Sequence, residues 1–162
     1  MKKKIEVEFF CKSKSWVNKM PHIKLSTNNT IKKMKDYFNS RLNYNLNIIL
    51  SDKKLVKKLN REYKKNNKDT DVLTFVSKIS NKNLGKILYC DIFFSIDTIE
   101  EYIKKNNISL YDHYKHLLVH SLLHLNGYNH ENDKQFNKMK KQEIIILKKI
   151  GISNPYDINV QK

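Results

Sequence analysis

The stretch from His113 to His130, HYKHLLVHSLLHLNGYNH, constrains this chain more than any other, since it carries five of the six histidines. It is rich in leucine, has no proline and meets its first glycine at Gly127, so it predicts a helix that ends there. Spacings of three, four and four residues place four histidines on one stripe: His113, His116, His120 and His124. The opposite side carries Leu118, Leu122 and Leu125. Neither stripe is charged, which predicts a helix buried on both sides.

Three of these histidines have the spacing of a metal site. His120 and His124 stand four residues apart on one helix face, and His130 follows the next turn, from which it can return to the pair. Three imidazole ligands with no cysteine nearby are typical of a catalytic zinc ion, which lowers the pKa of its bound water to about 7. We therefore predict one Zn²⁺ held by all three. For His113 and His116 structural roles are favoured, with support of the ligands as the alternative.

Strand and helix patterns alternate along the rest of the chain. The predicted strands are Ile5–Phe10, Leu46–Leu50, Val72–Val76 and Ile87–Phe94. The predicted helices are Ser26–Leu42, Lys53–Tyr63, Asp97–Lys105 and Asp133–Ile150, with Ser109 as the cap of the histidine helix. The short link between the last two strands predicts that they pair antiparallel, and the fourth strand is apolar enough to be central. Residues 1–162 thus predict a single α+β domain, a mixed four-stranded sheet packed with helices and a central metal-binding histidine helix.

The charge of the chain favours a polyanionic partner. Lysine and arginine number 32 against 16 acidic residues, a net charge of +16, and we prefer nucleic acid as the partner over a merely solubilising lysine coat. Cys11 and Cys90 lack partner spacing and are expected to be reduced thiols. Glu6 and Glu8 interrupt the first apolar run, which excludes a signal peptide, and no run reaches the roughly 20 residues of a membrane span. A cytoplasmic protein without a membrane partner is expected.

Two motifs in this order and separation carry a family resemblance. They are NREYKKNNKDTDVLTF, residues 60–75, and HLLVHSLLHLNGYNHEND, residues 116–133, joined by LYCDIFFS, residues 88–95, with Asp91 at its acidic position. The chain resembles the YbeY family, bacterial rRNA maturation factors regarded as zinc-dependent endoribonucleases. The resemblance implies zinc ligation by His120, His124 and His130. It also implies action in 3′ end maturation of small-subunit rRNA and in ribosome quality control, with the small ribosomal subunit and a GTPase assembly factor as partners.

The chain departs from the family pattern at four positions. Ser121 and Cys90 stand where the family usually has glycine, and Asn129 stands where it has aspartate. The fourth change is Lys64 in place of the functional arginine, which keeps the charge but loses the bidentate fork that grips a phosphate.

The resemblance makes Lys64 the candidate catalytic residue, stabilising charge on the phosphate. Arg61, one helical turn earlier, is a partial substitute for the missing arginine. The candidate RNA-binding residues are Arg61, Lys64 and Lys65.

Three functions remain open at this point. The first is a metal-dependent endoribonuclease that cuts single-stranded RNA, whose bases and backbone are accessible. The second is a metalloprotease, since the histidine and glycine spacing matches the metzincins, but Ser121 stands where those enzymes carry a glutamate as general base. The third is a non-catalytic ribosome-assembly protein in which zinc only holds the fold.

Overall fold

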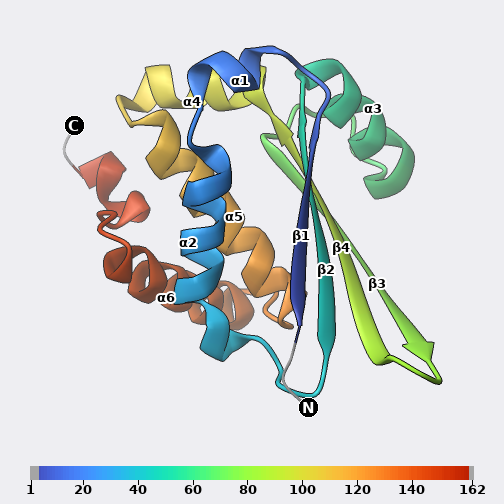
Figure 1. Ribbon diagram of the computed structural model, residues 1–162. Helices are drawn as coiled ribbons and strands as arrows, with labels where there is room; N and C mark the ends of the chain where they lie inside the picture. The colour runs from blue at the N-terminus through green and yellow to red at the C-terminus, as the bar shows by residue number, and fades with distance from the viewer. Residues whose placement is uncertain (1–3, 161–162) are drawn as a thin grey trace.

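The computed structural model describes residues 4–160, with side chains described as far as residue 157, and a four-stranded sheet forms its centre (Figure 1). The strands are β1 (Ile5–Cys11), β2 (Asn43–Ser51), β3 (Val72–Asn81) and β4 (Gly85–Ser95). Their spatial order is β1-β2-β4-β3, in which β1, β2 and β4 run parallel and β3 runs antiparallel to β4. The predicted α+β fold, the mixed sheet, the antiparallel last pair and the central fourth strand are confirmed.

Helices cover the two faces of the sheet unequally (Figure 1). On one face lies α3 (Lys53–Lys64), packed against β3 and β4. The helices on the other face are α1 (Ser15–Lys19), α2 (Ile23–Lys33), α4 (Ile96–Asn106), α5 (Leu110–Leu125) and α6 (Asp133–Lys149). Within this layer α5 is central, because α2, α4 and α6 all pack against it.

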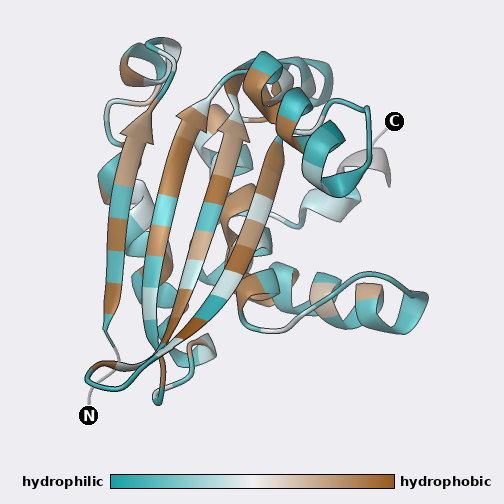
Figure 2. Ribbon diagram, turned by 90° about the vertical axis from the view of Figure 1, so that its right-hand side faces the viewer, coloured by the Kyte–Doolittle hydropathy of each residue, from teal (hydrophilic) through white to brown (hydrophobic). Residues whose placement is uncertain are grey.

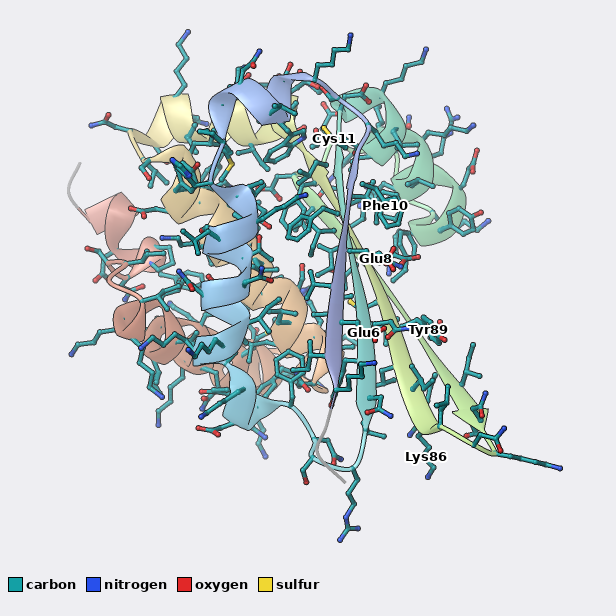
Figure 3. The ribbon with its side chains drawn as sticks, in the orientation of Figure 1. Glu6, Glu8, Phe10, Cys11, Lys86 and Tyr89 are labelled. Carbon is teal, nitrogen blue, oxygen red and sulfur yellow. The ribbon has the colours of Figure 1, made fainter. Side chains whose placement is uncertain are left out.

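The core lies between the sheet and α5. Strand residues alternate between hydrophobic and hydrophilic, as Figure 2 shows, and the hydrophobic ones face the helices. On β1, Glu6 and Glu8 are exposed and point away from α2 (Figure 3). The buried residues that meet in the core from β2 and α5 include Tyr44, Leu46, Ile48, Leu118, Leu122 and Leu125. The prediction that α5 is buried on both sides is confirmed for its leucine side, whereas on the histidine stripe His116, His120 and His124 are only partly buried.

The predicted helix Ser26–Leu42 is wrong at both ends. The structure has the earlier and shorter α2, followed by the single 3-10 turn Lys35–Tyr37 and an extended Phe38. Two contacts with β2 draw the chain out of the helix: the Phe38 ring packs edge-on against Tyr44, and the Asn39 N–H donates to the Tyr44 hydroxyl at 2.9 Å. These tertiary contacts override an apolar periodicity that continues past the end of the helix.

Two further differences have clear physical causes. Helix α1 has no counterpart among the predicted helices; its Trp16 is fully buried and donates from Nε1–H to the Ser51 carbonyl at 2.9 Å. Strand β3 continues well past the predicted end at Val76, because it stays paired with β4 until Asn81 meets Gly85.

The histidine helix is confirmed as α5. Its predicted cap, Ser109, accepts a hydrogen bond from the Asp112 N–H at 3.1 Å, which satisfies one of the free donors at the start of the helix. The helix ends before Gly127, whose φ of 94° lies in the left-handed region. Within residues 4–160, no helix combines the length and the apolar character needed to cross a bilayer.

Candidate metal centre

The three predicted ligands meet at one point. His120 and His124 come from the last two turns of α5, and the turn at Gly127 brings His130 back beside them. One ring nitrogen from each residue lies within 4.8 Å of the others. The ring centroids are 4.7 Å apart for His120 and His124, 4.7 Å for His124 and His130, and 5.3 Å for His120 and His130. The cluster can therefore hold a metal ion.

The electrostatics of the cluster fit a cation. Burial and then the neighbouring rings of His120 and His130 together lower the pKa of His124 to about 4. A neutral imidazole keeps the lone pair that a metal ion needs. Three neutral nitrogen donors suit zinc, which binds imidazole at roughly 2.0–2.1 Å, so the donor set fits the ion predicted from the spacing.

A buried carboxylate supports the first ligand. Glu143 of α6 is fully buried and hydrogen-bonds to the Nδ1 atom of His120. An Nδ1–H donated to this carboxylate leaves the Nε2 lone pair of His120 free to face a metal. Glu143 also pairs with His116 Nε2 at 3.1 Å and accepts a hydrogen bond from the Tyr156 hydroxyl. Burial alone would raise the pKa of Glu143, but the hydrogen bonds from His116 and His120 outweigh it and hold the pKa at about 2.

Glu143 has no counterpart among the residues singled out from the sequence. The sequence did hold a signal, because Met139, Glu143 and Ile146 are spaced to share one face of α6, where the charged residue interrupts an apolar stripe. All three side chains are buried. A carboxylate in such a position requires buried partners. Its partners could not be named in advance, because they lie 23 and 27 residues away in the sequence.

The two earlier histidines have supporting positions. His113 is buried, stacks on Tyr102 with 4.3 Å between ring centroids, and pairs through Nε2 with Asp71 Oδ2 at 3.0 Å. His116 shares the Glu143 carboxylate with the first ligand. Neither residue belongs to the three-nitrogen cluster.

The cluster opens into a groove of about 740 Å³ between α5 and β3. Lys64, the last residue of α3, lines this groove, and its ammonium lies 5.1 Å from the centroid of the Phe75 ring. Arg61 and Lys65 are exposed near the same end of α3 and are not among the lining residues. The structure thus places Lys64 in the same groove as the histidines and leaves the other two RNA-binding candidates outside it.

The remaining positions that depart from the family pattern lie at different depths. Ser121 is fully buried and hydrogen-bonds to Thr74 Oγ1 at 2.8 Å, whereas Asn129 lines the groove. Cys90 is buried in β4, where burial and then the neighbouring Asp91 raise the pKa of its thiol to about 12. Asp91 accepts a hydrogen bond from Asn47 Nδ2 at 2.8 Å and does not belong to the histidine cluster.

Fold and site together define a class: an α+β protein with a three-histidine cluster, able to hold a metal ion, at the end of a central helix. Comparison with known proteins identifies the family. The family described as "Endoribonuclease YbeY" matches residues 10–151. The chain belongs to the YbeY family.

Individual relatives agree with this assignment. The chain is similar to "Endoribonuclease YbeY" of Ehrlichia ruminantium strain Gardel, with 38% identity over 152 residues, covering 88% of this chain and 90% of the relative. It is similar to the protein of the same name from Francisella tularensis strain WY96-3418, with 34% identity over 125 residues, covering 72% and 73%. The solution structure of TM1509 from Thermotoga maritima superposes with a TM-score of 0.51 at 22% identity, covering 90% and 91%, which supports the fold.

Proposed function

We propose that this chain is a zinc-dependent endoribonuclease that cuts single-stranded RNA in the groove between α5 and β3. The observation that carries the proposal is the meeting of His120, His124 and His130 in a groove that Lys64 also lines. Membership of a family described as endoribonucleases supports RNA as the substrate. The net charge of +16 suits a polyanion.

The chain's own residues would divide the work as follows. A bound Zn²⁺ supplies Lewis-acid polarisation of the phosphate. His120 is held in the ligating tautomer by Glu143, so the site is pre-organised before RNA arrives. Lys64 brings a positive charge to the groove, where it would stabilise the negative charge that grows on the phosphate during cleavage. Arg61 and Lys65, exposed near the end of α3, would hold the RNA backbone as it leaves the groove.

Burial of Ser121 argues against the protease alternative. A metalloprotease with this histidine spacing needs a carboxylate there as general base, facing a water molecule at the metal. Ser121 is fully buried and its hydroxyl is hydrogen-bonded to Thr74. A residue in that position cannot take a proton from a substrate in the groove.

The biological role that we propose follows the family. It comprises 3′ end maturation of small-subunit rRNA and ribosome quality control, with the small ribosomal subunit and a GTPase assembly factor as partners. The cytoplasm is the proposed location, and Cys11 and Cys90, which are free thiols, fit its reducing conditions. We further propose that residues 1–162 act as one domain.

The test is a cleavage assay on single-stranded and duplex forms of one rRNA fragment. We expect internal cuts in the single strand, loss of cleavage with a chelator and recovery with Zn²⁺. His124→Ala should not recover. Zinc-loaded protein that binds the RNA without cutting it would instead support the non-catalytic assembly factor, and casein cleavage by the same sample would support the protease.

A further inference from the structure

The metal groove carries little of the positive charge of this protein. Among its lining residues the charged side chains are Lys64 and Asp71, besides the histidines. Those two charges cancel, which leaves the proposed Zn²⁺ as the net positive charge of the groove, whereas a protein that holds a long polyanion neutralises several phosphates with lysine or arginine. Tight binding of RNA therefore requires a positive surface elsewhere on the molecule.

A second groove of about 740 Å³ meets that requirement. It lies where α2 and α6 pack against α5 (Figure 1), and its lysines are Lys32, Lys33, Lys35, Lys115 and Lys149. Among the residues that the structure describes, no carboxylate lines this groove. We call it the basic groove. Its charge fits a chain of phosphates better than that of the metal groove does.

The basic groove and the metal cluster lie on opposite sides of α5. Tyr111 and Lys115, one turn apart, face the basic groove. Lys115 and His124 are nine residues apart in the helix, which at about 100° per residue is two and a half turns, so they point in opposite directions. A strand bound in both grooves must pass around the helix.

A third hollow, of about 520 Å³, lies next to both grooves along α5. It shares His113 and His116 with the metal groove. Its residues Asp112 and Gly151 directly follow Tyr111 and Ile150, which line the basic groove. The three hollows therefore succeed one another around the first half of α5.

We propose that the basic groove anchors the phosphate backbone of the RNA flanking the cleavage site, while the metal groove holds the cleaved segment. The inference rests on the proposed function, because it assumes that RNA is the substrate. It separates affinity from chemistry: long RNA is held mainly by the basic groove, and the rate of the chemical step depends on the metal groove.

Helix stability offers a different explanation for part of this charge. Lys32, Lys33 and Lys149 lie in the last turns of α2 and α6, where a cation stabilises the helix dipole. Lys115 lies within α5, away from its last turn, and this explanation does not cover it. Glutamine is a good helix former, so Lys→Gln removes the charge with little effect on helix propensity.

The experiment compares two quadruple variants that lose the same charge. The groove variant is Lys32→Gln/Lys33→Gln/Lys115→Gln/Lys149→Gln. The control is Lys54→Gln/Lys58→Gln/Lys82→Gln/Lys86→Gln, whose residues are exposed and line none of the three hollows. Figure 3 shows Lys86 near the tip of the β3–β4 hairpin, far from α2. Melting temperatures of both variants report any loss of helix stability.

The readouts are the Kd of a long single-stranded RNA over a range of salt concentrations and the single-turnover cleavage rate at saturating RNA. In the groove variant we expect Kd to rise about 10-fold or more at low salt. The slope of log Kd against log salt should fall by about 0.7 for each lysine that contacts a phosphate, up to ~2.8. The loss should fall on Kd and not on the saturated rate. The concentration of a tetranucleotide substrate that half-saturates its cleavage, which reports binding in the metal groove, should not rise.

Equal Kd values for the groove variant and the control would overturn the inference. An equal rise in the half-saturating concentration for tetranucleotide cleavage and in the Kd of the long RNA would also overturn it. So would loss of binding to vesicles of anionic lipid with no loss of binding to RNA, since the groove would then serve a membrane surface. Failure of the proposed function gives a different result, namely a wild-type protein that binds the long RNA without metal-dependent cleavage.

Discussion

Replacing Glu143 by glutamine tests whether the buried carboxylate prepares the metal site. Glu143 is fully buried and is shared by His116, His120 and Tyr156. Glutamine has nearly the same shape, but one of its two terminal groups is a hydrogen-bond donor and cannot accept. At least one of the three partners then faces an NH₂ group. His120 is the partner whose loss reaches the metal, because its Nδ1–H bond fixes the ring that carries the ligating nitrogen.

Two routes give the same magnitude for the effect. A hydrogen bond to a charged group contributes about 1.5–3 kcal/mol. Mutating a residue that orients a metal ligand typically weakens metal binding 10- to 100-fold, which corresponds to about 1.4–2.8 kcal/mol. We therefore expect Glu143→Gln to raise the Kd for Zn²⁺ by a factor of about 10 to 100 at pH 7 while the three histidines stay in place.

The assay is competition for Zn²⁺ between the protein and a chromophoric chelator, with a melting curve to establish that each variant is folded. Tyr156→Phe is the matched control, since it removes a donor from the same carboxylate and leaves the bond to His120 intact. Its Kd for Zn²⁺ should stay within about threefold of wild type, below the range expected for an orienting residue. A folded Glu143→Gln protein with wild-type affinity would refute the positioning role, as would a Tyr156→Phe protein that is equally impaired.

Three further predictions concern the ligands and Lys64. His124→Ala should lose stoichiometric metal by elemental analysis, and full retention would show that the site is assigned wrongly. Lys64→Ala should slow single-turnover RNA cleavage more than it weakens binding, by analogy with oxyanion-hole donors at about 2.7–4 kcal/mol of barrier. Lys64→Arg should keep or raise the cleavage rate. Equal small losses of rate in Lys64→Ala and Lys68→Ala would mean that Lys64 contributes only non-specific positive charge. The metal-free protein should lose stability as pH falls from about 6.5 towards 4, because the unfolded chain takes up a proton that folded His124, with its pKa of about 4, does not. Thermal unfolding of the wild type and of His124→Asn at several pH values measures how stability changes with pH. An unchanged pH dependence in the variant would contradict the assignment of this effect to His124.

The fold was predictable from periodicity wherever local pattern and tertiary contacts agree. The strand alternation of β1 and β2 and the leucine stripe of α5 reflect burial on one side, which sequence spacing records directly. The helix predicted to continue past Lys33 failed because Phe38 belongs to the same apolar pattern but packs on Tyr44 of β2. A contact between an element's end and the next strand leaves no periodic signal, so such boundaries remain beyond sequence reasoning.

The metal cluster was predictable for a different reason. Two of the predicted ligands are four residues apart on a helix, and the third follows six residues later, after the turn at Gly127, so local geometry alone brings them together. Glu143 reaches the same site from α6, and the basic groove combines α2, α5 and α6. Both depend on how helices pack. In a chain this rich in lysine, a cluster of lysines has no local signature either.

We propose that the surroundings of Lys64 let a lysine serve where the family usually has arginine. Arginine holds phosphate with a planar fork, whereas the lysine ammonium is a point charge on a flexible stem. Here the ammonium lies 5.1 Å from the centroid of the Phe75 ring, and Phe75 is itself fixed edge-on between Tyr63 and Phe93, with ring centroids 5.7 and 5.9 Å away. Such a contact contributes about 0.5–1 kcal/mol at an exposed site, which is enough to favour one placement of the stem. The aromatic ring thereby supplies part of the orientation that the missing fork would have given, and Phe75→Leu should reduce the rate advantage of Lys64 over alanine.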